Sequence, residues 1–233
     1  MDQVRRLVEP LDNMMWHAMS GPQRVLSEGD ERARRYPLAV GPFSAVPDIP
    51  TSDNFVALRD LVGPGNVAVL LRGDVTPPEG WEVEGLIDGV QMIGPKARAT
   101  LSRDSRIVTL GVDDVDQMMS LTSKTKPGPF APRTYELGLY LGIFVDGLLV
   151  SMAGQRARTE EYVEISAVCT DEAFVGQGFG RALINAQVEI ILAEGKSPML
   201  HAAASNLRAI ALYEFLGFRH RRKIGGAIMR SPL

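Results

Sequence analysis

Residues 164–183 read EISAVCTDEAFVGQGFGRAL. The first seven residues form a largely apolar, strand-like run, and the glycines at 176, 178 and 180 stand where a helix is expected to begin. Apolar residues then recur at helical spacing from Leu183 to Leu192, and Gly195 ends the pattern. This stretch therefore predicts a strand, a glycine turn and a helix in direct succession.

A glycine turn that opens a helix can bind an anion. The first N–H groups of a helix have no acceptor within it, and they carry the positive end of its dipole. Glycine lets a ligand approach the backbone without meeting a Cβ atom, and Arg181 adds a cation. The spacing matches neither the dinucleotide fingerprint Gly-x-Gly-x-x-Gly nor a nucleotide-triphosphate loop. A diphosphate fits this turn, and a tight connection without any ligand explains it equally well.

The C-terminal part, residues 105–233, divides into short strands and helices. Asp146-Gly147 supplies the positive φ angles of a hairpin turn, and Gly225-Gly226 predicts a second hairpin. The other predicted elements and the hairpin arms are strands at 106–110, 140–145, 148–153, 162–169, 199–203, 218–222 and 227–230, and helices at 113–121 and 206–216. This alternation indicates an α/β domain.

The N-terminal part, residues 1–104, is rich in proline and glycine between short apolar runs. Asn54–Val62 predicts a helix and Val67–Leu71 a strand, and the aperiodic stretch 94–105 is typical of a linker. This part has no glycine turn before a helix. We expect a smaller α/β segment that caps a binding site of the C-terminal part or forms the contact of a homodimer.

Two segments together resemble the GNAT superfamily of N-acyltransferases. The strand and glycine turn of 164–183 are similar to its acetyl-CoA-binding motif, in which Arg/Gln-x-x-Gly-x-Gly/Ala follows a strand. Residues 206–218, which read NLRAIALYEFLGF, are similar to a second motif of the superfamily, in the same order and at the same spacing. The resemblance covers about 106–233 and looks closest to the branch of glycine N-acyltransferase-like proteins.

The resemblance implies a mixed, mostly antiparallel sheet flanked by helices, preceded by the smaller N-terminal α/β segment. Some relatives in that branch carry a degenerate half of the same fold in this place, which is another interpretation of 1–104. The implied reaction moves an acetyl group directly from acetyl-CoA to a primary amine on a small molecule or a peptide. A non-catalytic acyl-CoA sensor on the same fold is the alternative.

The resemblance also assigns cofactor contacts. In the family the strand end pairs its backbone with the pantetheine arm, and the asparagine of the second motif touches the cofactor. The matching residues are Val168, Cys169, Thr170, Gly176, Gln177, Gly178, Phe179, Gly180, Arg181 and Asn206. The first position of the glycine motif is Val175 rather than Arg or Gln, so the backbone N–H groups act there without help from a side chain.

Aminolysis of a thioester needs a neutral amine and benefits from an acid for the departing thiolate. Tyr213 matches the family's tyrosine acid and lies two helical turns after Asn206. Glu164 matches the glutamate base of the histone acetyltransferase branch, and a partly buried position would raise the pKa of its carboxyl. A core tyrosine and a surface carboxylate are the structural alternatives. Glu160 or Glu161 could serve as the base instead.

Composition limits the other possibilities. A net charge of −3 and a pI near 5.7 argue against nonspecific binding to nucleic acid or an anionic membrane. The single cysteine excludes an intrachain disulfide, and a strand position suits it better than a nucleophilic role. The three histidines lack metal-site spacing. Because residues 1–6 lack the apolar core of a secretory signal, we expect a cytoplasmic protein.

Overall fold

The computed structural model describes residues 9–72, 76–97 and 104–233. The start of the chain and the centre of the expected linker lie outside these ranges. The described helices are α1 (Met14–Ser20), α2 (Ser52–Val62), α3 (Val115–Thr125), α4 (Phe179–Ala193) and α5 (Leu207–Phe215). The strands are β1 (Glu28–Gly29), β2 (Arg34–Arg35), β3 (Phe43–Ala45), β4 (Val67–Leu70), β5 (Glu82–Ile93), β6 (Ile107–Leu110), β7 (Tyr140–Val145), β8 (Leu148–Arg158), β9 (Tyr162–Thr170), β10 (Ser197–Ala203) and β11 (Arg219–Arg230).

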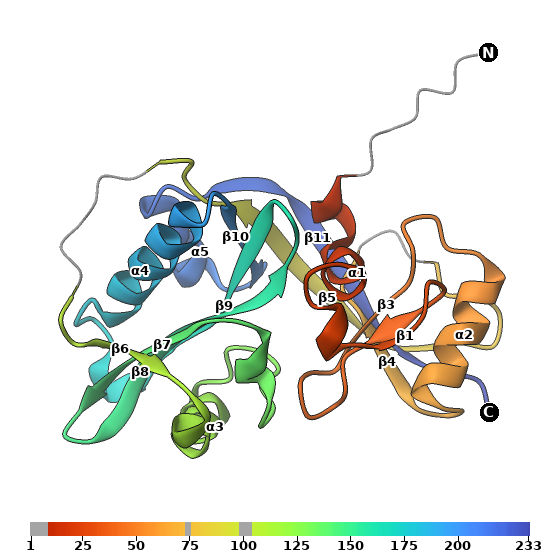
Figure 1. Cartoon of the computed structure of the whole chain (residues 1–233), viewed down its shortest axis with the longest axis horizontal. Coiled ribbons are helices and arrows are strands. Elements are labelled where there is room, and N and C mark those ends of the chain that lie inside the picture. The colour runs from red at the N-terminus through yellow and green to blue at the C-terminus, as the bar shows by residue number, and fades with distance from the viewer. Residues whose placement is uncertain (1–8, 73–75, 98–103) are drawn as a thin grey trace, which may run out of the picture.

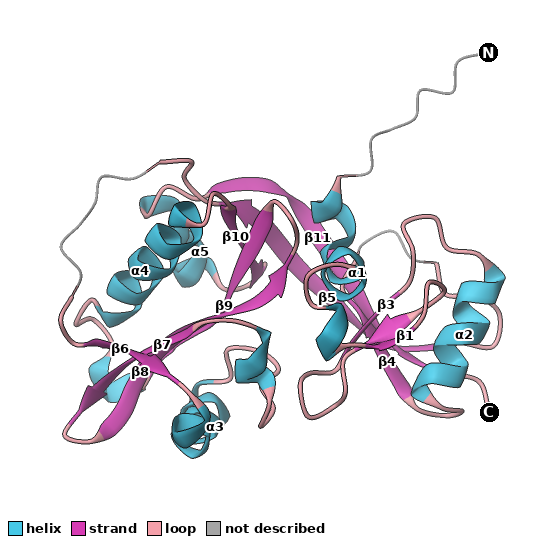
Figure 2. Ribbon diagram, in the orientation of Figure 1, coloured by secondary structure: helices cyan, strands magenta, loops and turns pink. Residues whose placement is uncertain are grey.

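These strands form one mixed sheet in the order β1-β2-β3-β4-β11-β5-β10-β9-β8-β7-β6. Neighbouring strands are antiparallel, except for the parallel pairs β3–β4 and β9–β10. Figures 1 and 2 show helices on both sides of this twisted sheet. The predicted fold, a mostly antiparallel sheet flanked by helices with a smaller α/β segment before it, is confirmed.

Apolar side chains fix the helices to the sheet. Helix α4 has an apolar face, and its Ile184 and Val188 pack with Ile165 of β9 and with Tyr213 of α5. Helix α3 buries Met118 and Leu121 against β8 and the distal half of β9. Helix α1, from the N-terminal part, packs against β3 and β8. Strand β8 is therefore in contact with helices of both parts of the chain.

The two parts of the chain share the sheet through β5 and β11. Strand β5, which precedes the expected linker, is hydrogen-bonded to β10 on one side and to β11 on the other. Strand β11 in turn pairs with β4 of the N-terminal part. In Figure 1 these two long strands run across the molecule between its two ends. The domain boundary between residues 104 and 105 stays a prediction. The hydrogen bonding of the sheet is continuous between the strands of the two parts.

One predicted hairpin is wrong. Residues 218–230 do not turn at Gly225-Gly226, because β11 is continuous from Arg219 to Arg230 and pairs these glycines with Asp88 and Ile87. A Cβ atom at Gly226 would lie 2.6 Å from the carbonyl oxygen of Leu70. Glycine is therefore required here by the close approach of β4. The hairpin of β7 and β8 is confirmed, with positive φ at Asp146 and Gly147.

Candidate functional site

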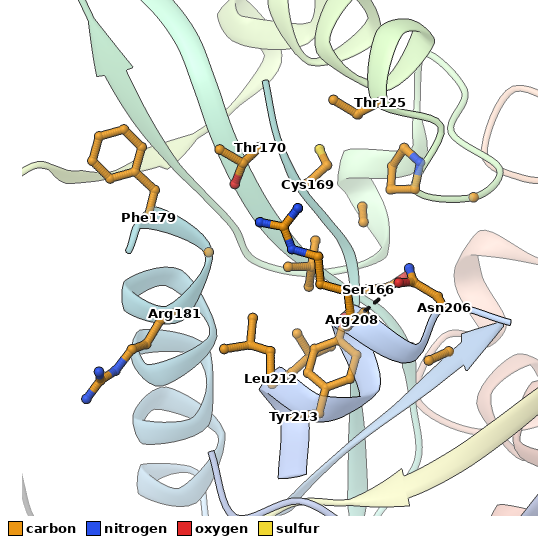
Figure 3. Close-up of a pocket in the computed structure, with 18 of the residues that line it drawn as sticks. Thr125, Ser166, Cys169, Thr170, Phe179, Arg181, Asn206, Arg208, Leu212 and Tyr213 are labelled. Atoms are coloured by element: carbon orange, nitrogen blue, oxygen red, sulfur yellow. Dashed lines mark hydrogen bonds between the residues drawn. The ribbon is translucent and has the colours of Figure 1, made fainter. Parts of the chain in front are cut away.

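The site begins where two parallel strands separate. Strands β9 and β10 pair from Tyr162–Ser197 to Ile165–Leu200, and no pairing follows beyond that point. Ala167 has a φ of 52°, an irregular position for a non-glycine residue inside a strand. A cavity of about 920 Å3 opens between the separated strands, the end of α3, the start of α4 and α5 (Figure 3). A ligand placed there can reach the unpaired edge of β9.

The glycine turn forms the outer end of this cavity. Gly176 and Gly178 have φ of 91° and 80°, and Gly178 caps α4. The N–H of Ala182 binds the carbonyl of Gly178, so the N–H groups before it in the first turn have no acceptor within α4. Added Cβ atoms at these two glycines would meet no atom within 4 Å. The turn is therefore an open concavity lined by N–H groups, and we call residues 176–181 the phosphate cradle.

Most of the predicted cofactor residues gather around this cavity. Its lining includes Val168, Cys169, Thr170, Gly176, Gly178, Phe179, Gly180, Arg181 and Asn206. Gln177 is exposed and is not among the lining residues. Val175, at the position where the family motif has Arg or Gln, does line the cavity and is 41% exposed. The backbone N–H groups of the turn are thus open to a ligand, with no side-chain donor at Val175.

Cations reach the cavity from two helices. Figure 3 shows Arg181 directed along α4, and its guanidinium lies over the ring of Phe215 at 5.1 Å from the centroid. Arg208 extends from α5 across the gap toward Thr170 (Figure 3). Sequence reasoning missed Arg208, although its place two residues after Asn206 in the second motif is a usable signal. The side chain of Asn206 accepts a hydrogen bond from the N–H of Ala209 and so caps α5.

Tyr213 lies on α5, in the wall of the same cavity. Its ring packs beside Phe218 with the centroids 6.0 Å apart, and the residue is 8% exposed. Burial raises the pKa of its hydroxyl to about 12. At neutral pH the phenol therefore keeps its proton, which is the state that an acid requires.

Glu164 differs from the expectation. It is fully buried and is not among the lining residues. Its two oxygens accept hydrogen bonds from Nε and Nη2 of Arg156, and Oε1 lies 2.7 Å from Nδ1 of His201. Burial alone raises the pKa of this carboxyl, but the charge of Arg156 and the contact with His201 outweigh it and hold the pKa at about 2. The prediction of a raised pKa is therefore wrong.

The alternative carboxylates lie elsewhere. Glu160 and Glu161 stand in the turn between β8 and β9 and border a separate small pocket with His17. Cys169 lines the main cavity, and burial raises the pKa of its thiol to about 11, so the sulfur is uncharged at neutral pH. Across the described ranges, no group of three metal-ligating side chains is present, and no helix is long and apolar enough to cross a bilayer.

Comparisons with known proteins agree with this geometry. Residues 140–224 match the FR47-like protein family. A crystal structure from Novosphingobium aromaticivorans, assigned to the GNAT family of acetyltransferases, is 35% identical and covers 97% of this chain and 100% of that chain, with a TM-score of 0.86. The GCN5-related N-acetyltransferase from Kribbella flavida shares the fold, at 14% identity, coverage of 95% and 93%, and a TM-score of 0.56. N-alpha-acetyltransferase 30 from Dictyostelium discoideum is 27% identical over 125 residues, which span 49% of this chain and 67% of that protein.

Proposed function

Because the chain belongs to the GNAT family of acetyltransferases, we propose that it transfers an acetyl group from acetyl-CoA to a primary amine by direct attack of the amine. The observation that carries this proposal is the cavity in which the phosphate cradle, the unpaired edge of β9 and Tyr213 meet. The cradle suits the diphosphate, and the edge of β9 offers backbone groups to the pantetheine amides. The thioester then lies in the inner part of the cavity.

The proposed step is a direct aminolysis. Acetyl-CoA supplies the activated acyl carbon; the amine nitrogen forms a bond to this carbon, and the carbon–sulfur bond breaks. Tyr213, which keeps its proton at neutral pH, donates it to the departing sulfur. We propose that the N–H of Val168 binds the developing oxyanion. Because the lining in the described ranges holds no carboxylate, we propose that the amine enters in its neutral form. Its nitrogen loses one of its two protons to water as the new bond forms, and water returns a proton to the Tyr213 phenolate.

Glu164 has a different part in this proposal. A carboxylate with a pKa near 2 is a weak base, and its oxygens already accept three hydrogen bonds. We propose that Glu164 orients Arg156 and His201, which both line the cavity. The glutamate is thus a positioning residue rather than the general base.

The test is a screen for release of free CoA thiol. Acetyl-CoA is offered with a diverse amine library that includes small amines, amino acids and peptides, since one relative carries the name N-alpha-acetyltransferase. We expect thiol release that depends on both substrates. Binding of acetyl-CoA without thiol release across the library would favour the sensor. Protection from thermal unfolding by NAD or ATP, and not by CoA, would contradict a CoA site altogether.

Three sequence-based expectations remain hypotheses beside this proposal. They are membership of the glycine N-acyltransferase-like branch, a cytoplasmic location and a homodimer formed through the N-terminal part. Size-exclusion chromatography with light scattering tests the dimer directly. A monomeric mass at micromolar concentration would exclude it at that concentration.

A further inference from the structure

The charged side chains that line the cavity are all cationic. The described lining contains the cations Lys126, Arg156, Arg181 and Arg208, and no aspartate or glutamate. A polycationic acceptor would therefore find no carboxylate to pair with its additional ammonium groups. An acceptor that carries an anionic group finds cations instead.

The cations stand at different depths. Arg181 belongs to the phosphate cradle, and Arg208 reaches toward Thr170 beside it. Arg156 lies at the other end, next to the Gln155–Ile165 pair of β8 and β9. Thr170 lies five positions after Ile165 on β9, which at the usual strand rise is about 17 Å. Arg156 is thus too far from the cradle to serve the diphosphate, and it borders the inner part of the cavity.

Arg156 is held in a fixed orientation. Its Nε and Nη2 donate to the two oxygens of Glu164, with Nε 3.0 Å from Oε2. Its guanidinium also lies over the ring of Phe43, 4.8 Å from the centroid. The side chain is 13% exposed, and Nη1 has no hydrogen-bond partner among the residues that the structure describes. A planar guanidinium bound along one edge by Glu164 keeps two donors on Nη1 for another acceptor.

Hydrogen bonds from the N-terminal part support this arrangement. Gln91 donates from Nε2 to the carbonyl of Leu11, and its Oε1 accepts from Arg221, so its amide orientation is fixed. It therefore donates to Nε2 of His201, 2.9 Å away. His201 must then carry its proton on Nδ1 and donate it to Glu164. The chain of contacts orients Glu164, and Glu164 orients Arg156.

We propose that Arg156 binds the carboxylate of the acceptor and that this acceptor is a small amine bearing a carboxylate, such as an amino acid. This inference rests on the proposed acetyl transfer and adds to it the acceptor class. Nη1 of Arg156 binds a carboxylate oxygen from the inner side of the cavity, while the acceptor amine faces the thioester. Lys126, on the loop that follows α3, lines the same cavity and adds a second positive charge.

The experiment compares each amino acid with its primary amide, which keeps the amine and loses the negative charge. Thiol release is measured with acetyl-CoA in excess. We expect kcat/KM to be about tenfold or more higher for the reactive acids than for their amides, as for a charge-assisted hydrogen bond. Amides that react as fast as the acids, or a peptide amino terminus that reacts faster than every free amino acid, would overturn the inference.

Variants assign the preference to Arg156. The double variant Arg156→Gln/Glu164→Gln removes both charges and so leaves neither partner buried and unpaired. We expect it to lose the preference for acids, so that kcat/KM for each acid and for its amide become equal within about twofold, whatever the absolute rates are. The control is Arg158→Gln on the same strand, whose guanidinium pairs with Glu194 and is not among the lining residues. It should keep the preference, and a double variant that also keeps it would overturn the inference.

A second measurement uses the unmodified protein and does not depend on turnover. Carboxylic acids that lack the amine, each with its matched amide as control, are titrated into the CoA-bound protein by calorimetry. We expect the acids to bind and the amides not to bind. If no amine is turned over but the acids bind the CoA-bound protein, the acetyl transfer fails and the anion site stands. If amines are turned over but acids and amides bind alike, the anion site fails alone.

Discussion

At the residue scale, the acid role proposed for Tyr213 gives a direct prediction. Tyr213→Phe removes one hydroxyl and keeps the ring that packs beside Phe218. We expect turnover to fall by about tenfold or more, as is typical when an acid is removed, with the affinity for CoA unchanged. Steady-state rates and CoA titration measure the two quantities. Tyr135→Phe, outside the cavity lining, is the control, and equal turnover in both variants would remove Tyr213 from the mechanism.

Glu164 predicts a pH-dependent stability. Its folded pKa of about 2 lies below the ordinary value of 4.5, so the carboxylate stabilises the fold above that ordinary value and loses this effect as the pH falls toward 2. At pH 7 we expect Glu164→Gln to be less stable by about 3–5 kcal/mol, because Arg156 remains buried without its partner. The difference from the natural protein should shrink between pH 4.5 and 2.

Denaturant unfolding at steps of pH measures this effect. Glu136→Gln is the control, because Glu136 pairs with Arg133 at the surface and such pairs contribute about 1 kcal/mol or less. A Glu164→Gln variant with the same stability as the control at pH 7 would show that the ion pair does not stabilise the fold.

Some residues of the site are predictable from the sequence, and the surroundings of others are not. Tyr213 and the glycines of the cradle follow from local motifs, because helix spacing and turn chemistry fix their neighbours within a few residues. The environment of Glu164 is not predictable from its motif, because Arg156 and His201 come to it from the two neighbouring strands. A pKa depends on such partners far along the chain. The prediction for Glu164 therefore had the wrong sign.

At the scale of elements, we expect the glycine turn and α4 to form one anion site. Gly178→Glu places a carboxylate and a side chain in the phosphate cradle, so we expect binding of CoA to be lost in a titration. The control is Gly195→Glu at the far end of α4, where the glycine also has a positive φ of 74° and open space around it. Both variants carry the same backbone strain. CoA binding retained by Gly178→Glu would rule out the cradle.

The elements themselves were predictable to different degrees. Amphipathic spacing and glycine stops predict helices α4 and α5, and an Asp-Gly turn predicts the hairpin of β7 and β8. The sequence predicts a hairpin in place of β11, because Gly225-Gly226 is a strong local turn signal. The neighbouring backbone of β4 keeps this segment extended instead. That contact is far along the chain, so a local sequence pattern does not reveal it.

At the scale of the whole molecule, β11 joins both parts of the chain, and Gly226 lies where it meets β4 and β5. Gly226→Ala would place a methyl group 2.6 Å from the carbonyl oxygen of Leu70 and 3.1 Å from the side chain of Ile87. The strands must shift to accept it, so we expect a loss of about 1–3 kcal/mol in the free energy of unfolding, as for other overpacked sites.

This substitution also tests whether the parts depend on each other. The cavity depends on the separation of β9 and β10, and β10 is held by β5, which β11 holds in turn. We therefore expect Gly226→Ala to lower the melting temperature and the temperature of CoA release together. Gly111→Ala, where a Cβ atom meets nothing within 4 Å, should change neither. Unchanged melting in Gly226→Ala would mean that the close approach of β4 to β11 does not support the fold, and the proposed dependence of the cavity on β11 would fail.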